Sequence, residues 1–171
     1  MTSKPITIRK ATAEDILFLQ AMSWEAVLVS PRLLASPGAE ALQKMEEQYW
    51  RRWKEHPDPA FVALDTTGRK LGAIIMRPHG TDEPVYGWRI SIAVEVQARS
   101  QGIGQRLIER AITFAREKSA PYVNLFVDST NTQAIALYQR VGFVQAIARY
   151  QRVGIIEVGE VDQIIEMRIN F

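Results

Sequence analysis

The sequence contains no cysteine, and that absence removes several kinds of chemistry at once. A chain without thiols forms no disulfide, holds no metal through thiolates and has no cysteine nucleophile. Histidine is nearly as scarce, since His56 and His79 are the two in the chain and each stands beside a proline. We expect both rings at the surface. Because no ligand cluster is visible in the sequence, we predict no metal site.

Long apolar runs and charge of one sign are also missing. No uncharged apolar stretch approaches about 18 residues, so we predict no segment that spans a membrane. The N-terminal residues MTSKPITIRK lack the apolar core of a signal peptide, which favours a cytoplasmic location. The 21 Lys and Arg residues are nearly balanced by 19 Asp and Glu residues, without a block of like charges. The sequence therefore indicates neither a nucleic-acid partner nor a membrane partner.

The composition that remains is that of an ordinary globular protein. The chain has 171 residues, of which 47% are hydrophobic and 23% charged, and it shows no linker or internal repeat. We therefore predict one domain over residues 1–171. Apolar periodicity predicts helices over 12–29, 36–55, 101–118 and 131–141, and strands over 6–8, 60–65, 71–77, 85–94, 122–127, 143–153 and 163–169. This order predicts an α/β protein of the α+β type with a mixed sheet.

Two short sequence patterns stand at the starts of predicted helices, and the second of them also suggests phosphate binding. Thr12 and Asp15 have the spacing of an N-cap with an acidic partner. Residues 99–104 follow the pattern R-x-x-G-x-G between a strand ending at Val94 and a helix. Glycines there allow a ligand to approach the first helical turn, whose free N–H groups and dipole attract phosphate oxygens. The alternative is a tight strand-to-helix turn in which the glycines serve packing alone.

A second motif downstream strengthens the phosphate-binding interpretation of the glycine turn. Residues 124–143 read NLFVDSTNTQAIALYQRVGF, in which Tyr138 stands seven positions after Asn131 and the pair Gly142-Phe143 follows. Together the two motifs resemble the GNAT superfamily of N-acetyltransferases. The resemblance implies a mixed, mostly antiparallel sheet of about seven strands flanked by about four helices, splayed between strands 4 and 5. It also implies acetyl-CoA as the cosubstrate.

The resemblance carries particular roles to residues of this chain. Ile92, Ala93 and Val94 would end the strand whose backbone pairs with the pantetheine arm. The pyrophosphate would lie on Arg99, Ser100, Gln101, Gly102, Ile103, Gly104 and Gln105. Asn131 would bond the pantetheine arm, although an N-cap role also fits it. Tyr138 would protonate the departing thiolate, its alternative being a packed helix residue.

The general base is where the sequence departs from the family. Many relatives place a glutamate in one of the two splayed strands, where this chain has Arg89, Ser91 and Ala93 in the first and Phe126 in the second. Glu95 and Asp128 are the remaining acidic candidates. Glu95 also fits a solvated loop residue, and Asp128 fits a support for the turn at 129–131. A water chain is a third route for the proton.

The acceptor site in this family lies between the first two helices and the last loop. Trp24, Leu33, Trp50 and Glu157 are the candidates here, with core packing as the alternative for the tryptophans. We predict an N-acetyltransferase in which a primary amine, a small molecule or amino acid derivative, attacks the thioester directly. The alternatives are a protein or peptide N-acetyltransferase and a non-catalytic acyl-CoA-binding domain of the same fold. The sequence leaves the acceptor, the base, the pathway and the question of a homodimer open.

Overall fold

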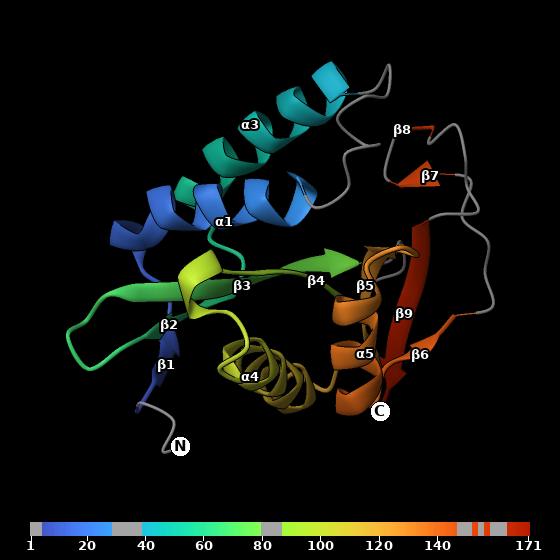
Figure 1. Cartoon of the computed structure of the whole chain (residues 1–171). Helices are drawn as coiled ribbons and strands as arrows, with labels where there is room; N and C mark the ends of the chain where they lie inside the picture. Colours follow the sequence, from blue (N-terminus) through green and yellow to red (C-terminus); the bar gives the residue numbers. More distant parts are fainter. Residues whose placement is uncertain (1–4, 29–38, 80–86, 147–151, 154–155, 158–163) are drawn as a thin grey trace.

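The computed structural model describes residues 5–28, 39–79, 87–146, 152–153, 156–157 and 164–171. A seven-stranded sheet in the order β1-β2-β3-β4-β5-β9-β6 forms its centre (Figure 1). The strands are β1 Thr7–Lys10, β2 Ala60–Leu64, β3 Lys70–His79, β4 Gly87–Val94, β5 Tyr122–Asp128, β6 Val144–Gln145 and β9 Ile164–Asn170. The helices are α1 Ile16–Leu28, α3 Ala39–Glu55, α4 Ile103–Glu117 and α5 Thr132–Val141.

The sheet opens between β4 and β5, the one neighbouring pair of its strands that runs parallel. These strands pair at two positions, Trp88 with Val123 and Arg89 with Asn124, and then diverge. On the far side of β5, pairing with β9 continues along the whole strand, from Tyr122 to Asp128. The facing edges of β4 and β5 beyond Arg89 therefore have no strand between them. This mixed, splayed sheet confirms the predicted fold class.

Helices cover both faces of the sheet, and a separate apolar core lies on each face (Figure 1). Helix α4 packs on one face through a stripe at helical spacing, as the sequence predicts. The buried members of this stripe are Ile103, Leu107, Ile108, Ala111, Ile112 and Ala115. The core on the other face, under α1 and α3, includes Leu19, Met22, Trp50 and Trp53.

The start of α1 is fixed by the buried carboxylate of Asp15. The backbone N–H of Thr12 donates to this carboxylate at 2.8 Å, which confirms the predicted N-terminal signal. Arg9 from β1 lies 2.6 Å from the same group and Lys70 from β3 lies 2.8 Å from it. The hydrogen bond from Arg9 holds the pKa of Asp15 well below its usual range. Helix α1 is thereby anchored to two strands.

Two expectations about local structure are wrong. The predicted strand over 143–153 is present as β6, which pairs with β9 at two positions on the sheet edge, and as β7 Arg152–Val153. β7 pairs with β8 Ile156–Glu157 in a separate small sheet. An alternating pattern does not reveal which partner each half of a strand finds. Residues 147–151 lie outside the described part.

His79 is the second expectation to be corrected, because its ring is half-buried and not at the surface. β3 extends through His79, which pairs with Gly87 of β4. A side chain at Gly87 would collide with the Tyr122 ring, its Cβ lying 2.1 Å from the nearest ring atom. Since glycine leaves that space, the Tyr122 hydroxyl reaches within 3.0 Å of His79 Nδ1. Burial lowers the pKa of His79.

Candidate active site

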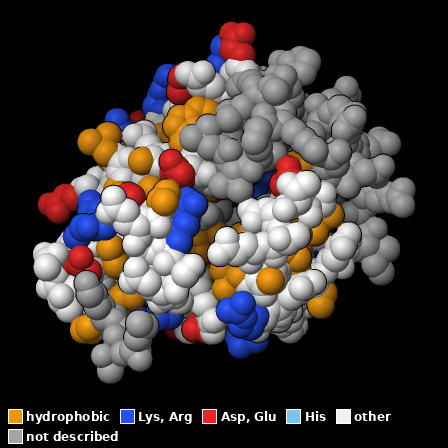
Figure 2. Space-filling model, in the orientation of Figure 1, with side chains coloured by type: hydrophobic (Ala, Val, Ile, Leu, Met, Phe, Trp, Pro, Cys, Tyr) orange, Lys and Arg blue, Asp and Glu red, His pale blue; other side chains and the backbone are white. Residues whose placement is uncertain are grey.

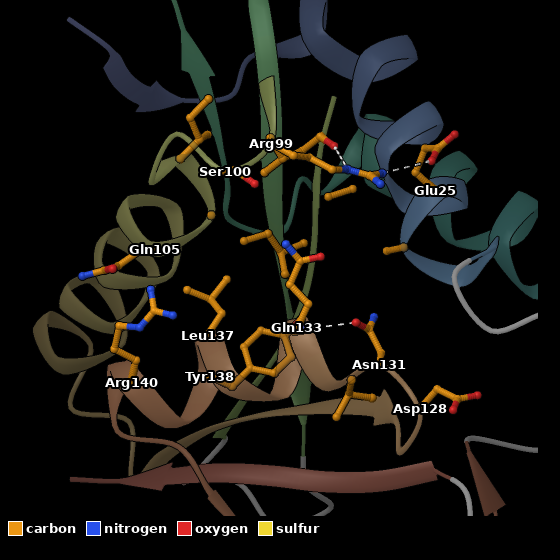
Figure 3. Close-up of a pocket in the computed structure, with 18 of the residues that line it drawn as sticks. Glu25, Arg99, Ser100, Gln105, Asp128, Asn131, Gln133, Leu137, Tyr138 and Arg140 are labelled. Carbon is orange, nitrogen blue, oxygen red and sulfur yellow. Dashed lines mark hydrogen bonds and ion pairs between the residues drawn. The ribbon is translucent and has the colours of Figure 1, made fainter. Parts of the chain in front are cut away.

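The divergence of β4 and β5 opens into a cleft of about 470 Å³ (Figure 3). Residues of β4, α4, β5, α5 and α1 line it. Of the residues predicted to hold the cofactor, the lining includes Ile92, Ala93, Val94, Arg99, Ser100, Gly102, Ile103, Gly104, Gln105, Asn131 and Tyr138. Gln101 is the exception: its side chain is exposed and donates to the carbonyl of Gln97 at 3.3 Å. The tertiary structure thus gathers two distant motifs around one space.

The glycine turn presents backbone donors to this cleft. Ser100 and Gly102 have φ of 60° and 74°, in the left-handed region that favours glycine. The first helical hydrogen bond runs from Arg106 N–H to the Gly102 carbonyl. The N–H groups of residues 103–105 therefore have no partner within the helix, and they lie at the positive end of its dipole. Such a turn is suited to an anionic ligand.

Packing does not explain the first glycine. A Cβ added to Gly102 would meet no heavy atom within 4 Å, whereas one added to Gly104 would lie 3.2 Å from Leu137 Cδ2. Backbone conformation requires glycine at 102, and close contact with α5 favours it at 104. The packing interpretation of the turn therefore fits Gly104 and does not account for Gly102.

The side chain of Arg99 leaves the turn and crosses toward α1 (Figure 3). Its Nε donates to the Val94 carbonyl at 3.0 Å, and its Nη2 lies 3.9 Å from Glu25 Oε2. Both side chains of this ion pair are 46% exposed. The guanidinium thus joins the turn to the first helix across the end of β4.

Tyr138 lies on α5 with 9% of its surface exposed, and it lines the cleft. Burial raises the pKa of its phenol to about 12, so the hydroxyl keeps its proton at neutral pH. No hydrogen bond joins this hydroxyl to another residue of the described part. The ring packs on Phe143, with centroids 6.1 Å apart. A buried, protonated phenol facing a cleft is suited to donating a proton.

Asn131 caps α5, as the alternative interpretation of this residue predicts. Its Oδ1 accepts a hydrogen bond from the Ala134 N–H at 3.1 Å. The side-chain amide nitrogen donates to none of the described residues, and Asn131 also lines the cleft. The cap uses the carbonyl oxygen of the Asn131 amide and leaves its nitrogen available. A bond from Asn131 to the pantetheine arm therefore stays a prediction, and it is compatible with the cap.

The two predicted base candidates lie in different surroundings. Glu95 does not line the cleft, and its backbone N–H donates to the Leu71 carbonyl at 2.8 Å. Asp128 lines the cleft but its carboxylate accepts from the N–H and hydroxyl of Thr130, at 2.9 and 2.7 Å. Asp128 therefore supports the turn before α5, which was its alternative interpretation.

Glu25 is a cleft residue that the sequence did not reveal. It lies on α1, far along the chain from both motifs, and helical periodicity does not distinguish it from other polar positions of that helix. The one indication in the sequence was the resemblance to the family, in which the first two helices border the acceptor site.

Of the predicted acceptor residues, the two tryptophans do not line the cleft. Trp24 is 36% exposed on α1 and is absent from the lining. Trp50 is 5% exposed in the core between α3 and the sheet, where its indole donates to Glu46 at 3.1 Å. The structure therefore supports core packing for Trp50. Leu33 and the side chain of Glu157 lie outside the described part.

Metal ligands and membrane-spanning helices are not found in the described part of the chain. There, no group of three or more His, Cys, Asp or Glu side chains is placed to hold a metal ion. Among the described residues no helix is long and apolar enough to cross a membrane. Charged side chains of both signs are interspersed over the face seen in Figure 2.

Comparison with known proteins agrees with this geometry. The family model described as the acetyltransferase (GNAT) family matches residues 24–143. The chain belongs to this GNAT family. It is 33% identical over 90 residues to a mycothiol acetyltransferase of Arthrobacter sp., a match covering 50% of this chain and 28% of that protein. The matched segment spans about a third of the length of such curated relatives.

Two solved structures share the GNAT fold across almost the whole chain. The ribosomal-protein-alanine N-acetyltransferase of Brucella melitensis has a TM-score of 0.68 at 21% identity, covering 96% of this chain and 99% of that one. The spermidine N-acetyltransferase of Vibrio cholerae, solved with CoA and spermine, has a TM-score of 0.66 at 18% identity. That likeness covers 96% of this chain and 95% of the Vibrio chain. At these identities the likeness concerns the fold.

Proposed function

We propose that this GNAT protein transfers the acetyl group of acetyl-CoA to a primary amine. The observation that carries the proposal is one continuous cleft. It connects the backbone donors of the glycine turn to the buried phenol of Tyr138. Acetyl-CoA would supply an acetyl group activated as a thioester. The turn suits its pyrophosphate, and the unpaired edge of β4 suits the amides of its pantetheine arm.

The chain's own residues supply the remaining steps. A backbone N–H near Val94 polarises the thioester carbonyl. The amine nitrogen attacks the carbonyl carbon directly, and the C–S bond breaks as the C–N bond forms. Tyr138 then gives its proton to the departing sulfur, a role supported by its burial and its proton-retaining pKa of about 12.

We propose a small amine or amino acid derivative as the acceptor. The similar proteins are named for different acceptors, so the choice rests on this chain. Phe126 lines the cleft where some protein N-terminal acetyltransferases of the family carry glutamate, and the Arg89 guanidinium lies 4.5 Å from its ring centroid. Acetylation of a protein or peptide N-terminus is the alternative acceptor class. A cytoplasmic location, a homodimer and a one-domain organisation stay predictions.

The test is thiol release from acetyl-CoA over a panel of primary amines and short peptides, with mass spectrometry of the products. We expect CoA release above hydrolysis and an acetylated product for at least one small amine.

A second candidate, a non-catalytic acyl-CoA-binding domain, is favoured by the phenylalanine at 126. It predicts tight CoA binding with no turnover on any acceptor. That result would overturn the enzymatic proposal.

A further inference from the structure

The two ends of the cleft differ in charge. At one end, which we call the turn end, lie the free N–H groups of residues 103–105 and the side chain of Arg140. At the other, the α1 end, lie the carboxylates of Glu25 and Asp128. Figure 3 shows Glu25 and Asp128 on the side of the cleft opposite Gln105 and Arg140. The turn end suits the cofactor phosphates, so the α1 end is the side left for the acceptor.

Apolar side chains accompany the two carboxylates and the Asn131 amide at the α1 end (Figure 3). Ala26 neighbours Glu25 on α1, and Phe126 lies on the same face of β5 as Asp128. Ile164 of β9 pairs with Asp128 and completes this part of the lining. Apolar walls reduce screening, so a carboxylate there attracts a cation more strongly than it does in open water.

Of the two carboxylates at this end, Glu25 is the one held by a long, exposed ion pair. Asp128 is engaged by two hydrogen bonds from Thr130. Glu25 has the 3.9 Å ion pair with Arg99, between two side chains that are 46% exposed. A pair of this length and exposure contributes little stability and exchanges readily. Arg99 also belongs to the glycine turn, so one guanidinium lies within reach of both ends of the cleft.

We propose that Glu25 binds the ammonium group of the acceptor, and that Arg99 exchanges Glu25 for the cofactor phosphates when acetyl-CoA binds. Glu25 then presents a carboxylate without its intramolecular cation to the incoming amine. This inference rests on the proposed acetyl transfer. It assigns acceptor binding to Glu25, because Glu95 does not line the cleft and the Asp128 carboxylate accepts two hydrogen bonds from Thr130.

The proton balance of the reaction is consistent with this placement. The ammonium that Glu25 binds gives one proton to water before the attack. The nitrogen lone pair forms the C–N bond while the C–S electron pair goes to sulfur, which takes the Tyr138 proton. The second surplus proton of the nitrogen restores the phenol. One ammonium and one thioester give one amide, one thiol and one released proton.

The charge of the α1 end also predicts which amines are accepted. An acceptor with a carboxylate beside its amine brings that carboxylate toward Glu25 and Asp128, where like charges repel. The same amine with its carboxylate removed or amidated avoids this repulsion. Glycinamide and tryptamine are therefore expected to exceed glycine and tryptophan in kcat/KM, by about tenfold or more.

The experiment compares Glu25→Gln with Glu117→Gln. Glu117 on α4 makes an ion pair of the same length, 3.9 Å to Arg110, and does not line the cleft. We expect Glu25→Gln to raise KM for glycinamide or tryptamine about tenfold, since the ammonium loses its counter-charge. Calorimetry should show CoA binding tightened by about two- to fivefold, because Arg99 is no longer shared. Glu117→Gln should change neither quantity.

Opposite shifts in the two affinities separate this role from misfolding, which weakens both. Unchanged KM in Glu25→Gln, weaker CoA binding in it, or a wild-type preference for glycine and tryptophan would each overturn the inference. Absence of turnover by the wild type on every amine would instead overturn the proposed function. Calorimetry on Glu25→Gln still reports on the exchange of Arg99 in that case.

Discussion

The turn end of the cleft contains the free N–H groups that open α4, whereas the α1 end is lined by side chains from α1, β5 and β9. The turn end is built by one local conformation, with left-handed φ at Ser100 and Gly102. The α1 end depends on how α1 lies across the sheet, anchored through Asp15. Backbone donors recognise a phosphate whatever side chains surround them, while side chains can vary with the acceptor.

The largest expected effect is at the turn end, where Gly104→Asp adds both bulk and negative charge. Its Cβ would lie 3.2 Å from Leu137 Cδ2, and its carboxylate would repel a phosphate at the proposed site. We expect CoA affinity to fall by about a thousandfold, roughly 4 kcal/mol, measured by calorimetry. Gly104→Ala, which adds the bulk alone, should cost far less. Equal losses in the two variants would show that charge at the turn is irrelevant.

Tyr138→Phe examines the middle of the cleft, between the two ends. Loss of the hydroxyl removes the proposed acid while keeping the ring that packs on Phe143. We expect kcat to fall by about a hundredfold, with CoA affinity within about twofold of the wild type. Steady-state kinetics on an accepted amine, paired with calorimetry, measures both. An unchanged kcat would remove Tyr138 from the mechanism.

A smaller effect distinguishes backbone strain from ligand binding at the turn end. Gly102→Ala and Gly68→Ala place a side chain at φ of 74° and 84°, each with open space around the new Cβ. Both should lower the free energy of unfolding by about 1 kcal/mol. CoA affinity should fall several-fold in Gly102→Ala alone, because Gly68 lies in the hairpin between β2 and β3. If the CoA affinity were the same in both variants, that result would argue against phosphate binding at the turn.

The smallest expected effect concerns kcat, which we expect to change little with pH through titration of Tyr138. Burial raises the pKa of Tyr138 to about 12, above the ordinary value of about 10, so folding favours the protonated phenol. The stabilisation from this shift is complete below the unfolded pKa and is lost as pH rises through the folded one. Deprotonation of Tyr138 should therefore produce no decline of kcat between about pH 7 and 9. A decline there that disappears in Tyr138→Phe would contradict the assignment.

The sequence predicted the features that depend on interactions between residues close together in the chain. The glycine turn, the apolar stripe of α4, the N-terminal signal at Thr12 and the cap at Asn131 all depend on contacts within a few residues. The predictions failed where partners come from distant segments. Trp50 has the same helical spacing whether it faces a core or a ligand, and His79 is half-buried because Gly87, on another strand, leaves space for Tyr122.

By itself, the sequence predicted a strand, a glycine turn and a helix in an arrangement that suits a phosphate-bearing ligand, because these structures are set by local backbone geometry and hydrogen bonding. The tertiary structure alone decided which carboxylate faces the other end of the cleft. Glu25 reaches that position because α1 crosses β4 and brings its carboxylate within 3.9 Å of Arg99. The angle of that crossing results from packing along the whole helix, and no short stretch of sequence encodes it.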